Sequence, residues 1–156
     1  MKPVVFLRVA SILTLIHAIL HTVGGVFGKP PSDTAAMVAA IMRERFQVFG
    51  LTRSYADFYL GMGLGITIFL TGEAIVFWML ASLAKSDSAR LRPILAVFLM
   101  GYLAFAVNSY LFFFYGPVIA ELLIAGCLAG AIFTANSTSE SQLQSAAQAK
   151  ALIPNA

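Results

Sequence analysis

Residues 58–84 read FYLGMGLGITIFLTGEAIVFWMLASLA, and this run contains a single charged side chain, Glu73. A hydrophobic stretch of about 18 or more residues with almost no charge is typical of a membrane span. At 1.5 Å per residue, a helix over this run is roughly 40 Å long, enough to cross a hydrocarbon core of about 30 Å with some tilt. The stretch therefore predicts a transmembrane helix.

Three further apolar runs lie before and after this one. The predicted spans are residues 4–27, 58–84, 94–115 and 118–135. Of the 156 residues, 60% are hydrophobic and only 11% are charged, whereas a soluble domain carries roughly a quarter charged residues. We therefore expect an all-α integral membrane protein, a four-helix transmembrane bundle over residues 1–135, followed by a polar mobile tail over residues 136–156.

The loop between the first two spans has a helical pattern of its own. The sequence Lys29-Pro30-Pro31 breaks the first helix, and Ser32 or Asp33 offers an N-cap. Apolar and charged side chains then alternate along the loop: Met37, Ile41, Phe46 and Phe49 beside Arg43, Glu44, Arg45 and Arg53. We interpret this segment as an amphipathic helix on the membrane surface. The alternative is a helix packed over the ends of the spans.

Basic side chains lie between the apolar runs rather than in one patch. This distribution is typical of membrane-flanking charge and argues against nucleic-acid binding. Six Lys and Arg residues fall on the side of both chain termini, and four fall on the other side. The bias predicts a plasma-membrane protein with both termini in the cytoplasm. Arg8 lies inside the first run, where its long side chain can snorkel to the headgroups.

Polar side chains inside apolar spans are costly, so each one is expected to have a hydrogen-bond partner or a functional role. In the first span, His17 and His21 are four residues apart and share a helix face with Thr14. Glu73 falls at the middle depth of the second span, where it can meet His17. Asn108 comes from the third span. We expect His17, His21, Glu73 and Asn108 to line one polar pocket inside the membrane.

Other polar and aromatic residues have simpler interpretations. Asp57 and Glu121 lie within about one turn of predicted helix starts, where negative charge complements the helix dipole, so we interpret both as boundary residues. The Gly116-Pro117 pair is expected to turn the chain into the fourth span. Aromatic side chains toward the end of the third span are interpreted as an interfacial belt: Tyr102, Tyr110, Phe112, Phe113, Phe114 and Tyr115.

Glycines predict close helix packing. Gly61 and Gly65 in the second span, and Gly126 and Gly130 in the fourth, form G-x-x-x-G patterns that let helix backbones approach closely. Gly72 continues the stripe of the second span. The contacts lie either within the chain or between chains, so a homo-oligomer or a larger membrane complex is an expected partner beside the membrane lipids.

The expected pocket favours binding of an apolar small molecule such as a lipid, a sterol or a quinone-like compound, with no cofactor. Two alternatives are an accessory subunit of a membrane complex and a small isomerase-type membrane enzyme that uses His17 or Glu73 as acid and base. The catalytic residues of such an enzyme stay unassigned. No metal is predicted, because a zinc site needs three or four ligands and no Cys pair completes the two histidines.

Overall fold

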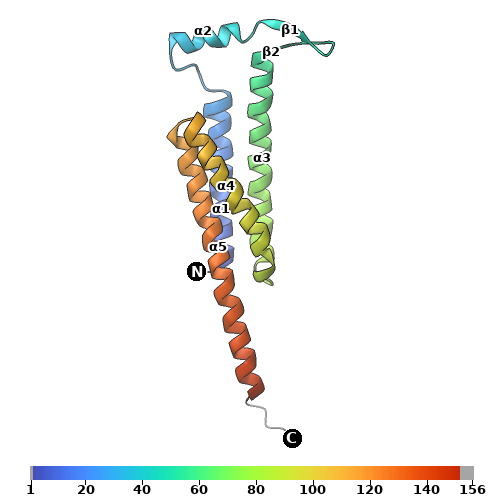
Figure 1. Ribbon diagram of the computed structural model, residues 1–156, viewed down its shortest axis with the longest axis vertical. Helices are drawn as coiled ribbons and strands as arrows, with labels where there is room; N and C mark the ends of the chain where they lie inside the picture. Colours follow the sequence, from blue (N-terminus) through green and yellow to red (C-terminus); the bar gives the residue numbers. More distant parts are fainter. Residues whose placement is uncertain (1, 152–156) are drawn as a thin grey trace. The chain divides into compact units, whose positions relative to one another are not determined.

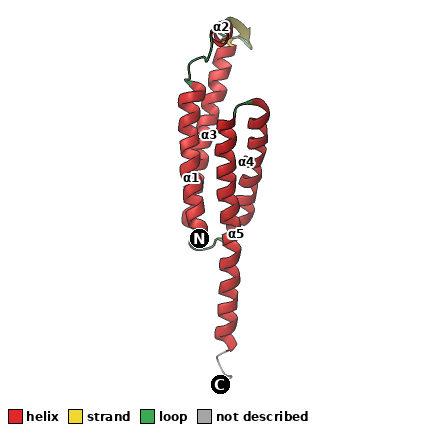
Figure 2. Cartoon of the chain, turned by 90° about the vertical axis from the view of Figure 1, so that its left-hand side faces the viewer, coloured by secondary structure: helices red, strands yellow, loops and turns green. Residues whose placement is uncertain are grey.

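The computed structural model describes the backbone of residues 2–151 and the side chains of residues 2–135. The predicted polar tail therefore lies outside the described side chains, and residues 152–156 lie outside the described chain altogether. Helix is the dominant secondary structure (Figures 1 and 2). As predicted, the described residues contain four helices that are long and apolar enough to cross a membrane: Pro3–Val26, Tyr55–Leu83, Ala89–Phe112 and Tyr115–Ala135.

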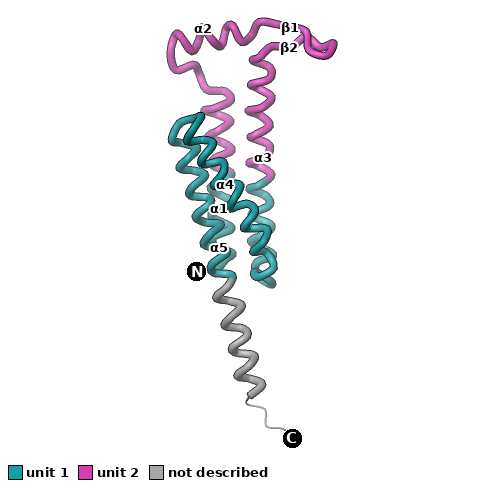
Figure 3. Tube along the Cα trace, viewed as in Figure 1, with its two compact units in different colours: residues 1–14, 73–156 teal, residues 15–72 magenta. Residues whose placement is uncertain are grey.

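The chain forms two compact units (Figure 3). Unit 1 consists of residues 1–14 and 73–156, and unit 2 consists of residues 15–72. Helix α1 (Pro3–Leu20) and helix α3 (Tyr55–Leu83) each contribute residues to both units.

Besides its portions of α1 and α3, unit 1 contains the helices α4 (Arg92–Phe112) and α5 (Tyr115–Ala151). Helix α4 follows a short 3-10 helix, η2 (Ala89–Leu91), and has Pro93 in its first turn, where a missing backbone N–H costs nothing. Helix α5 packs along α4. Large buried side chains from all four helices form the core of the unit: Leu7, Phe77, Leu80, Leu95, Ile124 and Leu128.

The turn between α4 and α5 lies earlier than the sequence predicts. The chain reverses at Phe113 and Phe114, and Gly116-Pro117 lies within the first turn of α5. Proline is tolerated there because the N–H groups of a first helical turn have no intrahelical acceptor. The predicted turn at Gly116-Pro117 is therefore wrong by a few residues.

In unit 2, a short helix, α2 (Asp33–Ile41), runs crosswise to α3 (Figure 1). The Ser32 hydroxyl accepts a hydrogen bond from the Ala35 N–H at 3.2 Å, so Ser32, one of the two N-cap candidates in the sequence, is the N-cap. After α2, the Met42 carbonyl accepts a hydrogen bond from the Ala56 N–H at 2.8 Å. This bond ties the end of α2 to the start of α3.

A β-hairpin follows α2, where the sequence predicted more helix. Strands β1 (Arg45–Val48) and β2 (Leu51–Ser54) pair antiparallel. Their two-residue turn has positive φ at Phe49 (48°) and Gly50 (80°), as a tight hairpin turn requires. Phe46 and Phe49 therefore lie in the hairpin, and their predicted place on an amphipathic helix is wrong. Glycine at the second turn position is the local signal for the hairpin.

Helix α3 starts with a reciprocal cap. The Ser54 N–H donates to Asp57 Oδ2 at 2.9 Å, and the Asp57 N–H donates to Ser54 Oγ at 3.2 Å. This capping box satisfies two backbone donors at the helix start. The boundary role predicted for Asp57 is confirmed, and the cap explains why α3 begins at Tyr55 rather than at the predicted Phe58.

Candidate functional site

Unit 1 holds a cluster of hydrogen-bonded polar side chains inside its apolar core. The Tyr102 hydroxyl donates to Glu73 Oε2 at 2.7 Å and lies 3.4 Å from Thr14 Oγ1. One residue beyond Glu73, the Ala74 carbonyl accepts a hydrogen bond from Ser11 Oγ at 2.6 Å. Thr14 and Tyr102 are buried. The cluster therefore joins α1, α3 and α4 through buried hydroxyl groups and the half-buried carboxyl group of Glu73.

A second acidic residue of unit 1 is held in a similar way. Ser109 Oγ donates to Glu121 Oε1 at 2.9 Å, and both residues are buried. The other carboxyl oxygen of Glu121 is buried and has no hydrogen-bond partner among the described residues. Glu121 lies in the second turn of α5 and contacts α4, so its predicted role as a helix-boundary residue is wrong.

The inward face of α4 explains both contacts. Its buried residues are Leu95, Tyr102, Ala106 and Ser109, and their spacings of seven, four and three place them on one side of a helix. Tyr102 was expected in the interfacial belt, and its burial corrects that prediction. The spacing of Tyr102 and Ser109 was the available signal for an inward polar face. The other predicted belt residues are exposed: Tyr110, Phe112, Phe113, Phe114 and Tyr115.

In unit 2, the two histidines lie near the point where the chain changes from α-helix to π-helix. Helix α1 continues directly into a π-helical segment, η1 (His21–Val26). His21 Nε2 lies 3.1 Å from the Gly63 carbonyl oxygen of α3. Val26 also packs against Gly63, because a Cβ added at that glycine would lie 2.9 Å from the Val26 side chain. The Nδ1 atom of His17 is buried and has no hydrogen-bond partner within the described part of the chain.

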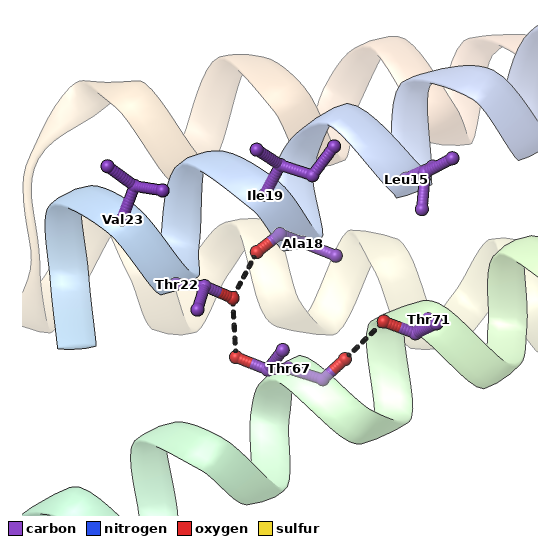
Figure 4. A pocket seen from close by; sticks show the side chains of 7 residues that line it. All are labelled: Leu15, Ala18, Ile19, Thr22, Val23, Thr67 and Thr71. Atoms are coloured by element: carbon purple, nitrogen blue, oxygen red, sulfur yellow. Dashed lines mark hydrogen bonds between the residues drawn. The ribbon is translucent and has the colours of Figure 1, made fainter. Parts of the chain in front are cut away.

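Next to these histidines, unit 2 contains a pocket of about 210 Å³ (Figure 4). We call it the threonine pocket. The hydroxyl oxygens of Thr22 and Thr67 face each other at 2.9 Å across η1 and α3, as the close-up shows. The pocket is lined by residues of α1, η1 and α3: Leu15, Ala18, Ile19, Thr22, Val23, Thr67 and Thr71.

The hydroxyl groups of the threonine pocket are already engaged as donors. Thr22 donates to the Ala18 carbonyl at 2.7 Å, and Thr71 donates to the Thr67 carbonyl at 2.8 Å. The Thr67 hydroxyl lies 3.2 Å from the Gly63 carbonyl and 2.9 Å from the Thr22 hydroxyl, and it donates its one proton to one of these two oxygens. A hydroxyl oxygen that donates can still accept. The pocket therefore offers apolar walls, a few acceptors and no charged side chain, which suits a neutral and mainly apolar molecule.

The four predicted pocket residues fall in different places. His17 and His21 belong to unit 2, and His21 immediately precedes Thr22 of the threonine pocket. Glu73 belongs to the cluster of unit 1. Asn108 is exposed on α4. None of the four lines the threonine pocket, and a single pocket shared by all of them stays a prediction.

Of the five glycines predicted to allow close helix packing, one lies against a neighbouring side chain and four do not. A Cβ added at Gly130 would lie 2.7 Å from the Phe6 ring, so the backbone of α5 approaches that ring closely. At the other four predicted positions, an added Cβ would meet nothing within 4 Å in the described chain: Gly61, Gly65, Gly72 and Gly126. These four make no close approach within their own units, and their role between chains stays a prediction.

Residues 2–135 contain no group of three or more His, Cys, Asp or Glu side chains that could hold a metal ion. Comparison of the chain with protein-family models, with curated proteins and with solved structures finds no match. A functional assignment therefore has to start from the geometry of the two units.

Proposed function

We propose that this chain is a multi-pass integral membrane protein that binds a neutral, mainly apolar small molecule in the threonine pocket. The observation that carries this proposal is the pocket itself, with its apolar walls and its three hydroxyl groups. Ligand sites are typically concave and apolar, with a small number of polar groups that orient the ligand.

Membrane insertion is supported by the outer surfaces of the four long helices. Large apolar side chains are exposed along each of them, including Ile68 and Phe69 on α3 and Val97 on α4. Such surfaces are stable in lipid and unfavourable in water. In unit 2, the crosswise direction of α2 and the fully exposed Phe49 at the hairpin tip suit a segment that lies along the membrane surface.

The size of the pocket narrows the class of ligand. Pockets that enclose a drug-sized molecule have volumes of about 300–1,000 Å³, whereas the threonine pocket measures about 210 Å³. A volume this small suits part of one acyl or isoprenoid chain better than a complete sterol ring system. We therefore favour a lipid or a quinone-like molecule whose tail lies in the pocket.

A bulky substitution in the pocket tests this proposal. Thr71 bonds only to the backbone of its own helix among the described contacts, so Thr71→Phe fills the pocket at little cost to the fold. Ile68→Phe is the matched control, because Ile68 is exposed on the same helix and does not line the pocket.

Native mass spectrometry of the gently solubilised protein should detect a co-purified apolar molecule in the unmodified chain and in Ile68→Phe. The molecule should be absent or strongly reduced in Thr71→Phe. Equal retention in both variants would contradict binding in the threonine pocket.

A second candidate function is that of an accessory subunit in a membrane complex. The open approach to Gly61, Gly65 and Gly126 favours it, because small residues on exposed helix faces let another helix pack closely. In this case native mass spectrometry should find the chain bound to another protein or to a second copy, with no small molecule.

A further inference from the structure

Arg8 and Trp78 form a contact in unit 1 that the proposed ligand site does not use. The guanidinium carbon of Arg8 lies 3.4 Å from the centre of the Trp78 ring. Its Nη2 atom donates to Ser82 Oγ at 3.3 Å. The flat guanidinium group is thus held between an aromatic face on α3 and a hydroxyl one turn further along the same helix.

Most of the hydrogen-bonding capacity of Arg8 is unused. A guanidinium group carries five N–H donors, and the bond to Ser82 is the one hydrogen bond that Arg8 makes to the described side chains and backbone. Its Nη1 atom is buried without an acceptor there. The ion pair found among those residues joins Arg90 to Asp87 instead. The positive charge of Arg8 therefore has no carboxylate partner in that part of the chain.

The position of Arg8 along its helix indicates what could supply the missing acceptor. Arg8 lies five residues after the start of α1, and Trp78 lies five residues before the end of α3. At 1.5 Å per residue both are about 7.5 Å from a helix end. This is the depth at which tryptophan and snorkelling arginine meet lipid headgroups. Lys85 follows on the connection from α3 to α4, Arg92 is the first residue of α4, and both add positive charge.

We propose that Arg8, Trp78 and Ser82 bind the phosphate group of an anionic phospholipid. Arginine presents a planar set of donors that matches phosphate oxygens in pairs, and a phosphate is the anion that the bilayer supplies at this depth. Stacking on Trp78 covers the face of the guanidinium, and because Nη1 is buried, the donors left for a phosphate are Nε and the second hydrogen of Nη2. This inference rests on the proposed membrane insertion and is independent of the threonine pocket.

Fluorescence can report on this site directly, because Trp78 is the only tryptophan in the chain. The full chain is purified in neutral detergent and titrated with phosphatidylglycerol that carries bromine, a quencher, on its acyl chains. We expect saturable quenching with a Kd about tenfold lower than for brominated phosphatidylcholine, because the choline cation is repelled by Arg8. Inorganic phosphate at millimolar concentration should displace none of the lipid.

Three variants distinguish a specific phosphate site at Arg8 from non-specific attraction of anionic lipid to positive charge. Arg8→Gln should raise the Kd for phosphatidylglycerol about tenfold. Arg8→Lys keeps the charge and should still weaken binding several-fold, since an ammonium group lacks the planar fork. Arg90→Gln is the control, because it removes an exposed arginine that is already paired with Asp87 at 3.1 Å.

An unchanged Kd in Arg8→Lys and Arg8→Gln would overturn the proposal, as would an equal rise in Arg90→Gln. If Arg8→Gln does not fold, the Lys variant alone decides. Displacement of the lipid by inorganic phosphate would assign the site to a free anion instead. Extraction of the chain from membranes by alkaline carbonate would refute membrane insertion as well, whereas a retained chain without lipid preference would refute the headgroup site alone.

Discussion

At the scale of single residues, Tyr102 connects its own helix, α4, to two others, because its hydroxyl lies against side chains of both α1 and α3. Its hydroxyl donates a hydrogen bond to Glu73 of α3, and the same oxygen lies 3.4 Å from the hydroxyl of Thr14 on α1. An acidic side chain in an apolar helix is costly when it lacks a hydrogen-bond partner. The hydrogen bond from Tyr102 therefore lowers the cost of placing Glu73 in the apolar helix α3.

Replacing Tyr102 with Phe should destabilise the protein by about 1 kcal/mol. The substitution keeps the ring in the core and removes the hydroxyl that donates to Glu73 at 2.7 Å. Chemical unfolding in detergent would measure the change, with Tyr110→Phe as the control, because Tyr110 is exposed on the same helix. Equal stability of the two variants would mean that the hydroxyl of Tyr102 is not needed to satisfy Glu73.

The same residues indicate how far the sequence could predict the site. The i, i+4 spacing predicted that His17 and His21 share a helix face, which stays a prediction: His17 lies in α1 and His21 opens the π-helical segment η1. The low charge of its span marked Glu73 as unusual. Tyr102 was misread because it was grouped with the aromatic residues at the end of α4, although it lies in the middle of that helix. Glu121 was misread because a polar residue near a helix start suits either a boundary or an inward contact. Only the packing of α4 against its neighbours decides between these two environments.

At the scale of elements, the four apolar helices could be predicted from composition alone, because a run of about 20 apolar residues has few alternatives. The hairpin was missed, because its mixture of apolar and charged residues also suits an amphipathic helix, and Gly50 at the turn was its one local signal. Local hydrogen bonds decide the ends of these elements. Ser54 and Asp57 fix the start of α3 in this way.

Replacing Ser54 with Ala should destabilise the first turn of α3 by about 1 kcal/mol. The variant loses the hydroxyl that accepts the Asp57 N–H. Hydrogen exchange should accelerate for the amides of residues 55–58 and stay unchanged in α5. Thr34→Ala, at an exposed position of α2, is the control. Protection of residues 55–58 equal to that of the control would show that the cap contributes nothing.

Two glycines of α5 provide a matched test of helix packing. Gly130→Ala would place a Cβ 2.7 Å from the Phe6 ring, whereas Gly126→Ala meets nothing within 4 Å. Both substitutions gain about the same helix propensity, roughly 1 kcal/mol. The difference in unfolding free energy therefore isolates the steric cost, which we expect to disfavour Gly130→Ala by about 1 kcal/mol. No difference would mean that Phe6 moves aside freely.

At the scale of the whole molecule, the decisive property is the even number of long apolar helices among the described residues. If all four cross the bilayer, the loop between α3 and α4 lies on the side of both termini, and the segment with α2 and the hairpin lies opposite. The excess of Lys and Arg predicts that the terminal side is cytoplasmic.

Cysteine labelling tests this topology in cells. In a Cys127→Ala background, single cysteines at Ser88 and Ser139 should react only after the membrane is permeabilised, and a cysteine at Ser32 should react with an impermeant reagent in intact cells. Labelling of Ser88 and Ser139 from opposite sides would exclude four spans. Labelling of all three sites in intact cells would exclude membrane insertion of these helices.

The π-helical segment has a consequence that concerns rotation about the helix axis. In an α-helix, residues five apart point about 140° away from each other, so His21 and Val26 would lie on nearly opposite faces. Here both meet Gly63, and the segment is closed by a bond from the Phe27 N–H to the Thr22 carbonyl at 3.0 Å. The wide turn acts as a single extra residue in the helix. A chain shortened by one glycine here, at Gly24 or Gly25, would wind as ordinary α-helix and turn Val26 about 100° away from Gly63.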